Sequence, residues 1–451
     1  MRGLTSTLVL ALVLAGLGAY IYFGEAPPAG DENRESLFTV EADQITGIRL
    51  TAGGETSVIE KDGDTWKMTA PVATDADATE VSGLTSNLAS VAINRVVDEQ
   101  ASDLAAYGLA DPRIRVAYTT AAGGAGTLEI GDKTPAGSDV YARAGDSNRV
   151  VLVSSFLETT FDKKPFDLRD KSVLAFERDK ADGITIRHGS GEPIRLARDG
   201  STWTVEAPVK ARGDYGAIEG LLTRLSTASM SALVETDGTD LAKYGLADPA
   251  ARITVSTGSS QATLALGPDV DGKTYARDEA RELVFTVDPS LVTDLEKDVA
   301  AYRTKEVFGF RPFNAEQLTL VRNGTTVRLS KGGGDAGWQL ERDGAKADVE
   351  QARVEDLLTK LSNIRAESFA ETTDGSGLAN PALTVAVSYD GGTFERVRLA
   401  TDAGQGFAGR EDEPGAARVP VAAVEDAVKA FEAVLEPPAP APDAAKPPAG
   451  P

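Results

Sequence analysis

Hydrophobic positions along the chain follow three patterns, and each predicts a different kind of element. An uncharged run begins at Leu4 and ends at Phe23, which is long enough to cross a bilayer as one helix. Short segments such as residues 45–50 alternate apolar and polar residues, as strands do. Over residues 78–97 the apolar residues recur every three or four positions, which predicts a helix packed on a sheet.

The same patterns recur along the chain at a constant interval. An Asp-Gly-x-Thr-Trp stretch occurs at residues 62–66 and 199–203, and Tyr-Gly-Leu-Ala-Asp-Pro occurs at residues 107–112 and 244–249. Both offsets are 137 residues (203 − 66 and 244 − 107). An eroded third copy contains Trp338 and then Gly-Leu-Ala-Asn-Pro. A constant offset between separate motifs indicates a duplicated module of domain size.

Each module is expected to contain three strands, a helix, four strands and a closing helix. Runs of strands separated from helices indicate an α+β fold. We therefore predict three tandem repeats of a mostly antiparallel sheet with two helices each, preceded by one N-terminal transmembrane helix. The predicted parts are a cytoplasmic end and anchor (1–24), a linker (25–35), module 1 (36–172), module 2 (173–306), a degenerate module 3 (307–435) and a Pro/Ala-rich disordered tail (436–451).

Charges beside the apolar run predict its orientation. Arg2 precedes the run, whereas Glu25, Asp31 and Glu32 follow it, so positive-inside bias places the N-terminus in the cytoplasm and the rest of the chain outside. The alternative is a cleaved signal peptide, although no clean Ala-x-Ala site follows the run. Both interpretations export the bulk of the chain.

Composition excludes several classes of function. The net charge of −23 opposes binding to nucleic acid, because phosphate neutralisation requires clustered Lys and Arg. The chain has no cysteine, so thiolate metal sites and thiol nucleophiles are impossible. His188 is the only histidine, and it is expected at the end of a strand. We predict no catalytic residue, no metal site and no cofactor.

Three motifs resemble ligand sites but fit structural roles better. Residues 267–274 match the P-loop pattern, yet a strand-like stretch follows them and two acids would repel phosphate, so a strand-connecting loop is expected. Residues 332–337 match G-x-G-x-x-G only once, at the place of a hairpin turn. Asp75, Asp77 and Glu80 could contribute to a calcium site, or they could be solvated acids at a helix start.

The repeated motifs supply the candidate partner-binding residues. Each Tyr-Gly-Leu-Ala-Asp-Pro stretch is interpreted as a helix stop with Gly in the left-handed conformation, and a partner-binding loop is the alternative. A recurring Tyr-Ala-Arg motif places an arginine on a strand, where it can pair with an acid or bind an anion. The candidates are Tyr107, Asp111, Arg143, Tyr244, Asp248, Arg277 and Arg410.

Taken together, these motifs resemble the DUF4340 family of bacterial envelope proteins. The resemblance covers about residues 4–435, although the third copy lacks the Tyr of Tyr-Gly-Leu and has Asn-Pro in place of Asp-Pro. The family has no established activity, and its members are often encoded beside ABC transporter components of the gliding-motility type. The resemblance implies an accessory role and a bacterial inner-membrane location, with the bulk of the chain in the periplasm.

We therefore expect a membrane-anchored, non-catalytic extracytoplasmic protein that accompanies an ABC-type transport or envelope complex. Its expected partners are an envelope protein, with ABC transporter subunits as candidates, and the membrane itself through residues 4–23. The alternatives are an exported hydrolase that uses carboxylates and a scaffold that binds the cell wall.

Overall fold

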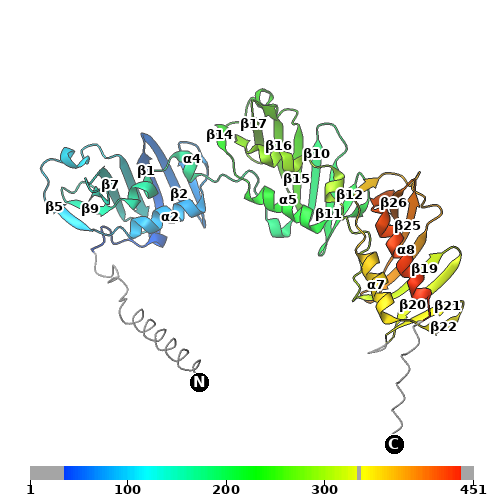
Figure 1. Ribbon diagram of the computed structural model, residues 1–451. Helices are drawn as coiled ribbons and strands as arrows, with labels where there is room; N and C mark the ends of the chain where they lie inside the picture. The colour runs from blue at the N-terminus through cyan, green and yellow to red at the C-terminus, as the bar shows by residue number, and fades with distance from the viewer. Residues whose placement is uncertain (1–34, 333–336, 438–451) are drawn as a thin grey trace, which may run out of the picture. The chain divides into compact units, whose positions relative to one another are not determined.

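Three nine-stranded sheets share one strand order in the computed structural model, which describes residues 35–332 and 337–437 (Figure 1). Counted along each module, the order across the sheet is 4-3-2-1-6-7-8-9-5. All neighbouring strands are antiparallel. Because the order is the same three times, the internal repeat predicted from the motifs is present in the fold.

Module 1 places its α-helices after the fourth and the ninth strand, and its 3₁₀ helices before the first strand and after the fifth. Its strands are β1 (Ile45–Ala52), β2 (Glu55–Asp62), β3 (Thr65–Ala70), β4 (Thr74–Asp75), β5 (Arg95–Asp98), β6 (Ile114–Thr120), β7 (Ala125–Lys133), β8 (Asp139–Ala144) and β9 (Val150–Ser154). Its helices are η1 (Ala42–Gln44), α2 (Ala78–Ala89), η2 (Ala105–Tyr107), α3 (Phe156–Phe161) and α4 (Pro165–Leu168).

Module 2 repeats this order of elements. Its strands are β10 (Gly183–His188), β11 (Ile194–Asp199), β12 (Thr202–Ala207), β13 (Ala211–Arg212), β14 (Ala232–Glu235), β15 (Ala251–Thr257), β16 (Ser260–Val270), β17 (Lys273–Asp278) and β18 (Val284–Val287). Its helices are η3 (Arg178–Lys180), α5 (Tyr215–Thr227), η4 (Leu241–Tyr244), α6 (Pro289–Leu295) and η5 (Val299–Tyr302).

Module 3 closes with one long helix instead of two short ones. Its strands are β19 (Ala315–Arg322), β20 (Thr325–Lys331), β21 (Trp338–Arg342), β22 (Ala345–Asp348), β23 (Ser368–Ala370), β24 (Leu383–Tyr389), β25 (Thr393–Asp402), β26 (Gln405–Arg410) and β27 (Ala416–Val419). Its helices are α7 (Gln351–Ser362) and α8 (Val421–Leu435).

The two faces of each sheet are covered differently. In module 1 the main core joins Leu84 of α2 to inward-facing strand residues such as Ala142 and Val151. The adjacent residues Tyr141 and Val150 belong to a second, smaller cluster with the Tyr-Gly-Leu segment. Since neighbouring residues of a strand point to opposite faces, the helices cover one face and the Tyr-Gly-Leu segment covers the other.

The fold-class prediction is wrong and is corrected by these elements. Each sheet has nine strands instead of the expected seven, and module 1 has three α-helices instead of two. The missed strands are too short to show a period: β4 and β13 have two residues each, and β5 overlaps the end of the stretch predicted as helix 78–97. The helix there ends at Ala89, because Ser90 caps it and the following apolar residues enter the core from a loop.

The transmembrane part of that prediction is corrected too. Within residues 35–332 and 337–437, no helix is both long enough and apolar enough to cross a membrane. The run from Leu4 to Phe23, most of the linker and most of the Pro/Ala-rich tail lie outside the described residues.

Backbone contacts divide the chain into two compact units, Met1–Lys171 and Ser172–Pro451. The first unit contains module 1. The second unit contains modules 2 and 3, and a network of ion pairs joins these two modules.

Candidate functional site

The Tyr-Gly-Leu segments lie against the Tyr-Ala-Arg strands. In module 1 the ring centroids of Tyr107 and Tyr141 are 5.1 Å apart, and in module 2 those of Tyr244 and Tyr275 are 5.0 Å apart. Gly108 and Gly245 each follow a 3₁₀ turn with a φ of 66°, as the helix-stop interpretation requires. Two motifs distant in sequence therefore meet at one place on the outer face of each sheet.

A glycine in the neighbouring strand permits this close approach. A Cβ atom on Gly131 would lie 2.1 Å from the carbonyl oxygen of Tyr107, and one on Gly267 would lie 2.4 Å from that of Tyr244. Real Cβ atoms do not approach that closely, so both positions require glycine. Because module 3 has Ser376 in place of the tyrosine, the tyrosine pair is absent there.

Tyr244 also takes part in a small polar cluster. Its hydroxyl donates to Glu235 at 2.5 Å, and the ammonium of Lys243 lies 4.8 Å from its ring centroid. The hydrogen bond to Glu235 raises the pKa of Tyr244, because a phenolate beside a carboxylate is unfavourable. The cluster therefore keeps Tyr244 protonated and holds the segment on the sheet.

Arg143 belongs to an ion-pair ladder across three strands of module 1. Arg115 of β6 lies opposite Glu129 of β7, which lies opposite Arg143 of β8. The two arginine Nε atoms are 2.8 and 2.5 Å from the Glu129 carboxylate, which is only 4% exposed. The ladder satisfies this buried carboxylate, and it fulfils the expectation that the strand arginine can pair with an acid.

In module 2 the equivalent arginine has another partner. Strand register places Ala265 where module 1 has Glu129, so no acid is available at that position. Arg277 instead donates to the carbonyl oxygen of Arg281 at 3.0 Å. The recurrence of the arginine therefore reflects two different local contacts.

Arg410 is not the counterpart of Arg143 and Arg277. Register aligns Ala142, Ala276 and Ala408, so Gly409 occupies the place of the two earlier arginines. Because side chains alternate along a strand, Arg410 points to the opposite face. The prediction that Arg410 is the third copy of this arginine is therefore wrong by one residue.

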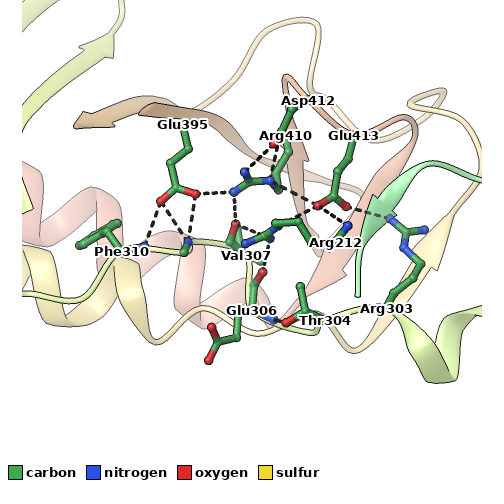
Figure 2. A network of polar contacts seen from close by, with 11 residues as sticks. Arg212, Arg303, Thr304, Glu306, Val307, Phe310, Glu395, Arg410, Asp412 and Glu413 are labelled. Atoms are coloured by element: carbon green, nitrogen blue, oxygen red, sulfur yellow. Dashed lines mark hydrogen bonds and ion pairs between the residues drawn. The ribbon is translucent and has the colours of Figure 1, made fainter. Parts of the chain in front are cut away.

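On that face, Arg410 is part of the charged network that joins modules 2 and 3 (Figure 2). Its guanidinium contacts Glu395 at 2.5 Å and Asp412 at 2.9 Å, and it donates to the carbonyl oxygen of Val307 at 2.9 Å. Burial alone would lower the pKa of Arg410, but hydrogen bonds to the two carboxylates raise it above the ordinary value. Arg410 is therefore a fixed cation that holds the start of module 3.

Glu413 lies at the centre of the network and forms ion pairs with three arginines. Its carboxylate is 2.8 Å from Arg212 and 3.3 Å from Arg303, both from module 2, and 3.5 Å from Arg410. The Arg303 guanidinium also lies 3.8 Å from the ring centroid of Phe369 in module 3. Burial lowers the pKa of Arg303, and the Glu413 carboxylate opposes that effect.

A second buried carboxylate holds the backbone at the start of module 3. Glu395 accepts the N–H groups of Gly309 at 3.0 Å and Phe310 at 3.2 Å, in addition to Arg410. Arg212 donates to the carbonyl oxygen of Glu306 at 2.5 Å. A cavity of about 20 Å³ beside Arg212, Glu306 and Glu413 has room for a water molecule but not for a substrate.

The remaining candidates lie on the surface. Asp111 and Asp248 are exposed, each directly before the proline that ends its segment. Asp111 borders a shallow hollow together with Arg113 and Glu158. Their exposure leaves both aspartates accessible to a partner.

The other sequence motifs occupy ordinary structural positions. Residues 267–274 run through the β16–β17 hairpin, where Asp269 accepts the N–H of Gly272, so the strand-connecting interpretation is confirmed. Asp77 caps α2, and Asp75 pairs with Lys67. His188 ends β10 as expected. The G-x-G-x-x-G match includes residues 333–336, which lie outside the described residues.

Sequence reasoning missed most of the junction between modules 2 and 3. Arg212, Glu395 and Glu413 belong to no repeated motif, so nothing in the chain distinguished them from other charges. Arg303 did carry a signal, because Leu-Arg-Asp-Lys after module 1 matches Tyr-Arg-Thr-Lys after module 2. An arginine repeated at a module boundary could have been proposed as a contact to the following module.

Comparison with known proteins assigns the chain to a family. Residues 66–204 and 203–381 match the family described as "Domain of unknown function (DUF4340)", so the chain belongs to it and the predicted resemblance is confirmed. No curated protein matches this chain.

Several solved structures align with the chain only weakly. They include a DNA polymerase sliding clamp from Caulobacter crescentus, with 12% sequence identity, coverage of 86% of this chain and 93% of the clamp, and a TM-score of 0.16. The sliding clamp from Bartonella birtlesii has 10% identity, coverage of 86% of this chain and 93% of the clamp, and a TM-score of 0.16. The DNA polymerase III β subunit from Pseudomonas aeruginosa has 10% identity, coverage of 85% of this chain and 94% of the subunit, and a TM-score of 0.16. These TM-scores are too low to support an argument about fold or function.

Proposed function

We propose that this protein is a non-catalytic, extracytoplasmic accessory protein that binds a protein partner in the cell envelope. The observation that carries the proposal is that three buried carboxylates are all bound by groups of the chain itself. Glu129, Glu395 and Glu413 are saturated by arginines and backbone N–H groups of the chain itself. Carboxylates held in this way stabilise the fold instead of activating a water molecule.

The same contacts favour a rigid binding platform. Glu413 ties two arginines of module 2 to module 3, and Arg410 and Glu395 fix the backbone where module 3 begins. A platform whose modules do not move against each other presents one defined surface, which reduces the entropic cost of binding.

Exposed aromatic side chains on module 3 offer a contact surface. Phe313 is 80% exposed and Phe394 is 55% exposed. Both flank the β24–β25 turn: Asn314, next to Phe313, donates to Asp390 in that turn at 3.0 Å, and Phe394 is the second residue of β25. Aromatic residues are enriched at the centres of protein interfaces.

The partner class and the location rest on other grounds. The resemblance to a family encoded beside ABC transporter components suggests a transporter subunit as the partner. Export is suggested by the uncharged run at residues 4–23, which lies outside the described residues. The net charge of −23 favours a partner with a basic surface.

Capture after crosslinking in whole cells tests the proposal. The tagged chain is expected to recover ABC transporter subunits that an unrelated exported acidic protein does not recover. If the two baits recover the same proteins, the proposed role is wrong. Appearance of a tag only in the cytoplasmic fraction would contradict the location.

A further inference from the structure

One helix position reaches across to the closing helices in modules 1 and 3 but not in module 2. It is the third residue after the N-cap of α2, α5 and α7, and it is Glu80, Ala217 and Arg353 respectively. Glu80 pairs at 2.8 Å with Lys163, which lies between α3 and α4. Arg353 donates to the carbonyl oxygen of Ala433 in α8, also at 2.8 Å. The methyl group of Ala217 is too short for such a contact, so module 2 lacks the side chain that closes this place in the other two modules.

Module 2 has a cavity of about 530 Å³ at this place. Small residues of α5, namely Gly216, Ala217 and Gly220, form one side of the cavity, and Ala301 and Tyr302 of η5 contribute to the other. A Cβ atom on Gly220 would meet no neighbouring segment within 4 Å, so the helix surface there is free. The volume lies in the range of sites that hold small organic molecules.

Basic side chains outnumber acidic ones around this cavity. Arg224, Lys297 and Lys305 line it, together with one acid, Asp294. The Asp294 carboxylate is shared, because it lies 3.3 Å from Arg224 and 3.2 Å from Lys297, and the described part of the chain offers Lys305 no ion-pair partner. Three basic groups and one acid leave a formal charge of +2 (3 − 1) in a chain whose net charge is −23. This local excess of positive charge favours an anion.

Two buried donors beside the cavity lack an acceptor. Tyr302 is 1% exposed, and within residues 35–332 and 337–437 its hydroxyl has no hydrogen-bond partner. The Nε atom of Arg224 is also buried and makes no hydrogen bond with these residues. Arg169 and Arg303 form equivalent backbone bridges in modules 1 and 2, and Leu168 precedes the first as Tyr302 precedes the second. An apolar side chain therefore suffices for the fold at this position, and the unpaired hydroxyl of module 2 suits a ligand that supplies an acceptor.

We propose that the cavity between α5 and η5 binds a small organic oxyanion, which is a molecule with a carboxylate or phosphate group and an apolar part. The oxyanion accepts hydrogen bonds from the Arg224 guanidinium and the Tyr302 hydroxyl, since both are donors without an acceptor. The ammonium groups of Lys297 and Lys305 attract its charge. The apolar part packs on the small residues of α5. This site lies on module 2 and does not depend on the aromatic surface of module 3.

Ligand-observed NMR titration of the full chain tests the proposal. The probes are benzoate, phenyl phosphate and benzamide, which is the neutral counterpart of benzoate. At least one of the two anions should bind at least about tenfold more tightly than benzamide, because only the anions form charge-assisted hydrogen bonds. The anion that binds more tightly distinguishes a carboxylate ligand from a phosphate ligand. Equal binding of the three probes, or binding of none, would overturn the proposal.

Two variants test whether the anion binds in this cavity. Ala217→Glu introduces the acid that module 1 has at this position and should weaken binding at least about tenfold, and it should remain folded because an acid suits the first turn of a helix. Tyr302→Phe keeps the ring, removes the donor and should weaken binding about tenfold. Lys273→Gln is the matched control: it changes the net charge by the same amount as Ala217→Glu, but at an exposed position of β17 outside the cavity, and should bind like the unaltered chain. Binding that is unchanged in both cavity variants would show that the anion does not occupy this site.

Discussion

Replacement of Glu413 by glutamine is the sharpest test of the junction between modules 2 and 3. The Glu413 side chain is 11% exposed, and Arg303 and Arg410 beside it are 8% and 9% exposed. Removal of one partner from a buried ion pair costs about 3–5 kcal/mol, because the remaining charge stays desolvated. Arg212 is 26% exposed and regains water, so we expect a loss of about 2–4 kcal/mol for Glu413→Gln.

Calorimetry and urea unfolding measure this loss. At about 2–4 °C per kcal/mol, the transition of the second unit should fall by about 4–16 °C. Glu411→Gln is a matched control in the same loop, since its pair with Arg396 is 46–61% exposed and is worth about 0–1 kcal/mol. In a double-mutant cycle, Arg303→Met should add little once Glu413 is replaced. If Glu413→Gln unfolds like Glu411→Gln, the network does not hold the two modules together.

Three further predictions concern single positions. Burial acts to raise the pKa of Glu158, but hydrogen bonds from two basic side chains hold this pKa below its ordinary value. The contribution of Glu158 to stability is therefore present above about pH 4.3 and is lost as the pH falls through the lowered pKa. Glu158→Gln should flatten the pH dependence of stability, measured by urea unfolding, between about pH 5 and 3. Burial raises the pKa of Tyr302 to about 12, so the contribution of Tyr302 to stability is present below about pH 10 and is lost as the pH rises through 12. Tyr302→Phe should remove this loss of stability. Titration of Tyr302 at the ordinary pKa of a phenol, followed by absorbance, would contradict the prediction. Gly131→Ala should destabilise module 1 by about 1–3 kcal/mol, because the added Cβ atom would meet the carbonyl oxygen of Tyr107. The control Gly83→Ala has open space around its Cβ atom on α2 and should stabilise the module by about 0.5–1 kcal/mol. Equal thermal unfolding of the two variants would disprove the close approach of Tyr107 to Gly131.

Periodicity in the sequence located the long elements but not the short edge strands. The spacing of apolar residues predicted a helix over residues 78–97, and α2 does begin at Ala78, although it ends at Ala89. The two residues of β13 have no measurable period, and only their pairing with β12 makes them a strand. Edge strands of this kind depend on tertiary contacts that are not encoded locally.

The candidate residues show what motif recurrence can and cannot indicate. The recurring Tyr107 and Tyr244 do occupy equivalent places, and their sequence context correctly predicted the left-handed glycine that follows each. Recurrence failed for Arg410, because a shift of one residue turns a strand side chain to the other face. It also gave no information on Glu413, whose importance arises only where two modules meet.

Crosslinked capture with variants of the aromatic surface tests the central claim most directly. A photo-crosslinker placed at Asn314 should trap a transporter subunit in living cells, and Phe313→Ser with Phe394→Ser should reduce the yield at least about tenfold. Glu129→Gln, which alters a buried ladder on module 1, should leave the yield unchanged after correction for protein level. Loss of capture with Glu129→Gln but not with the aromatic variant would contradict the account.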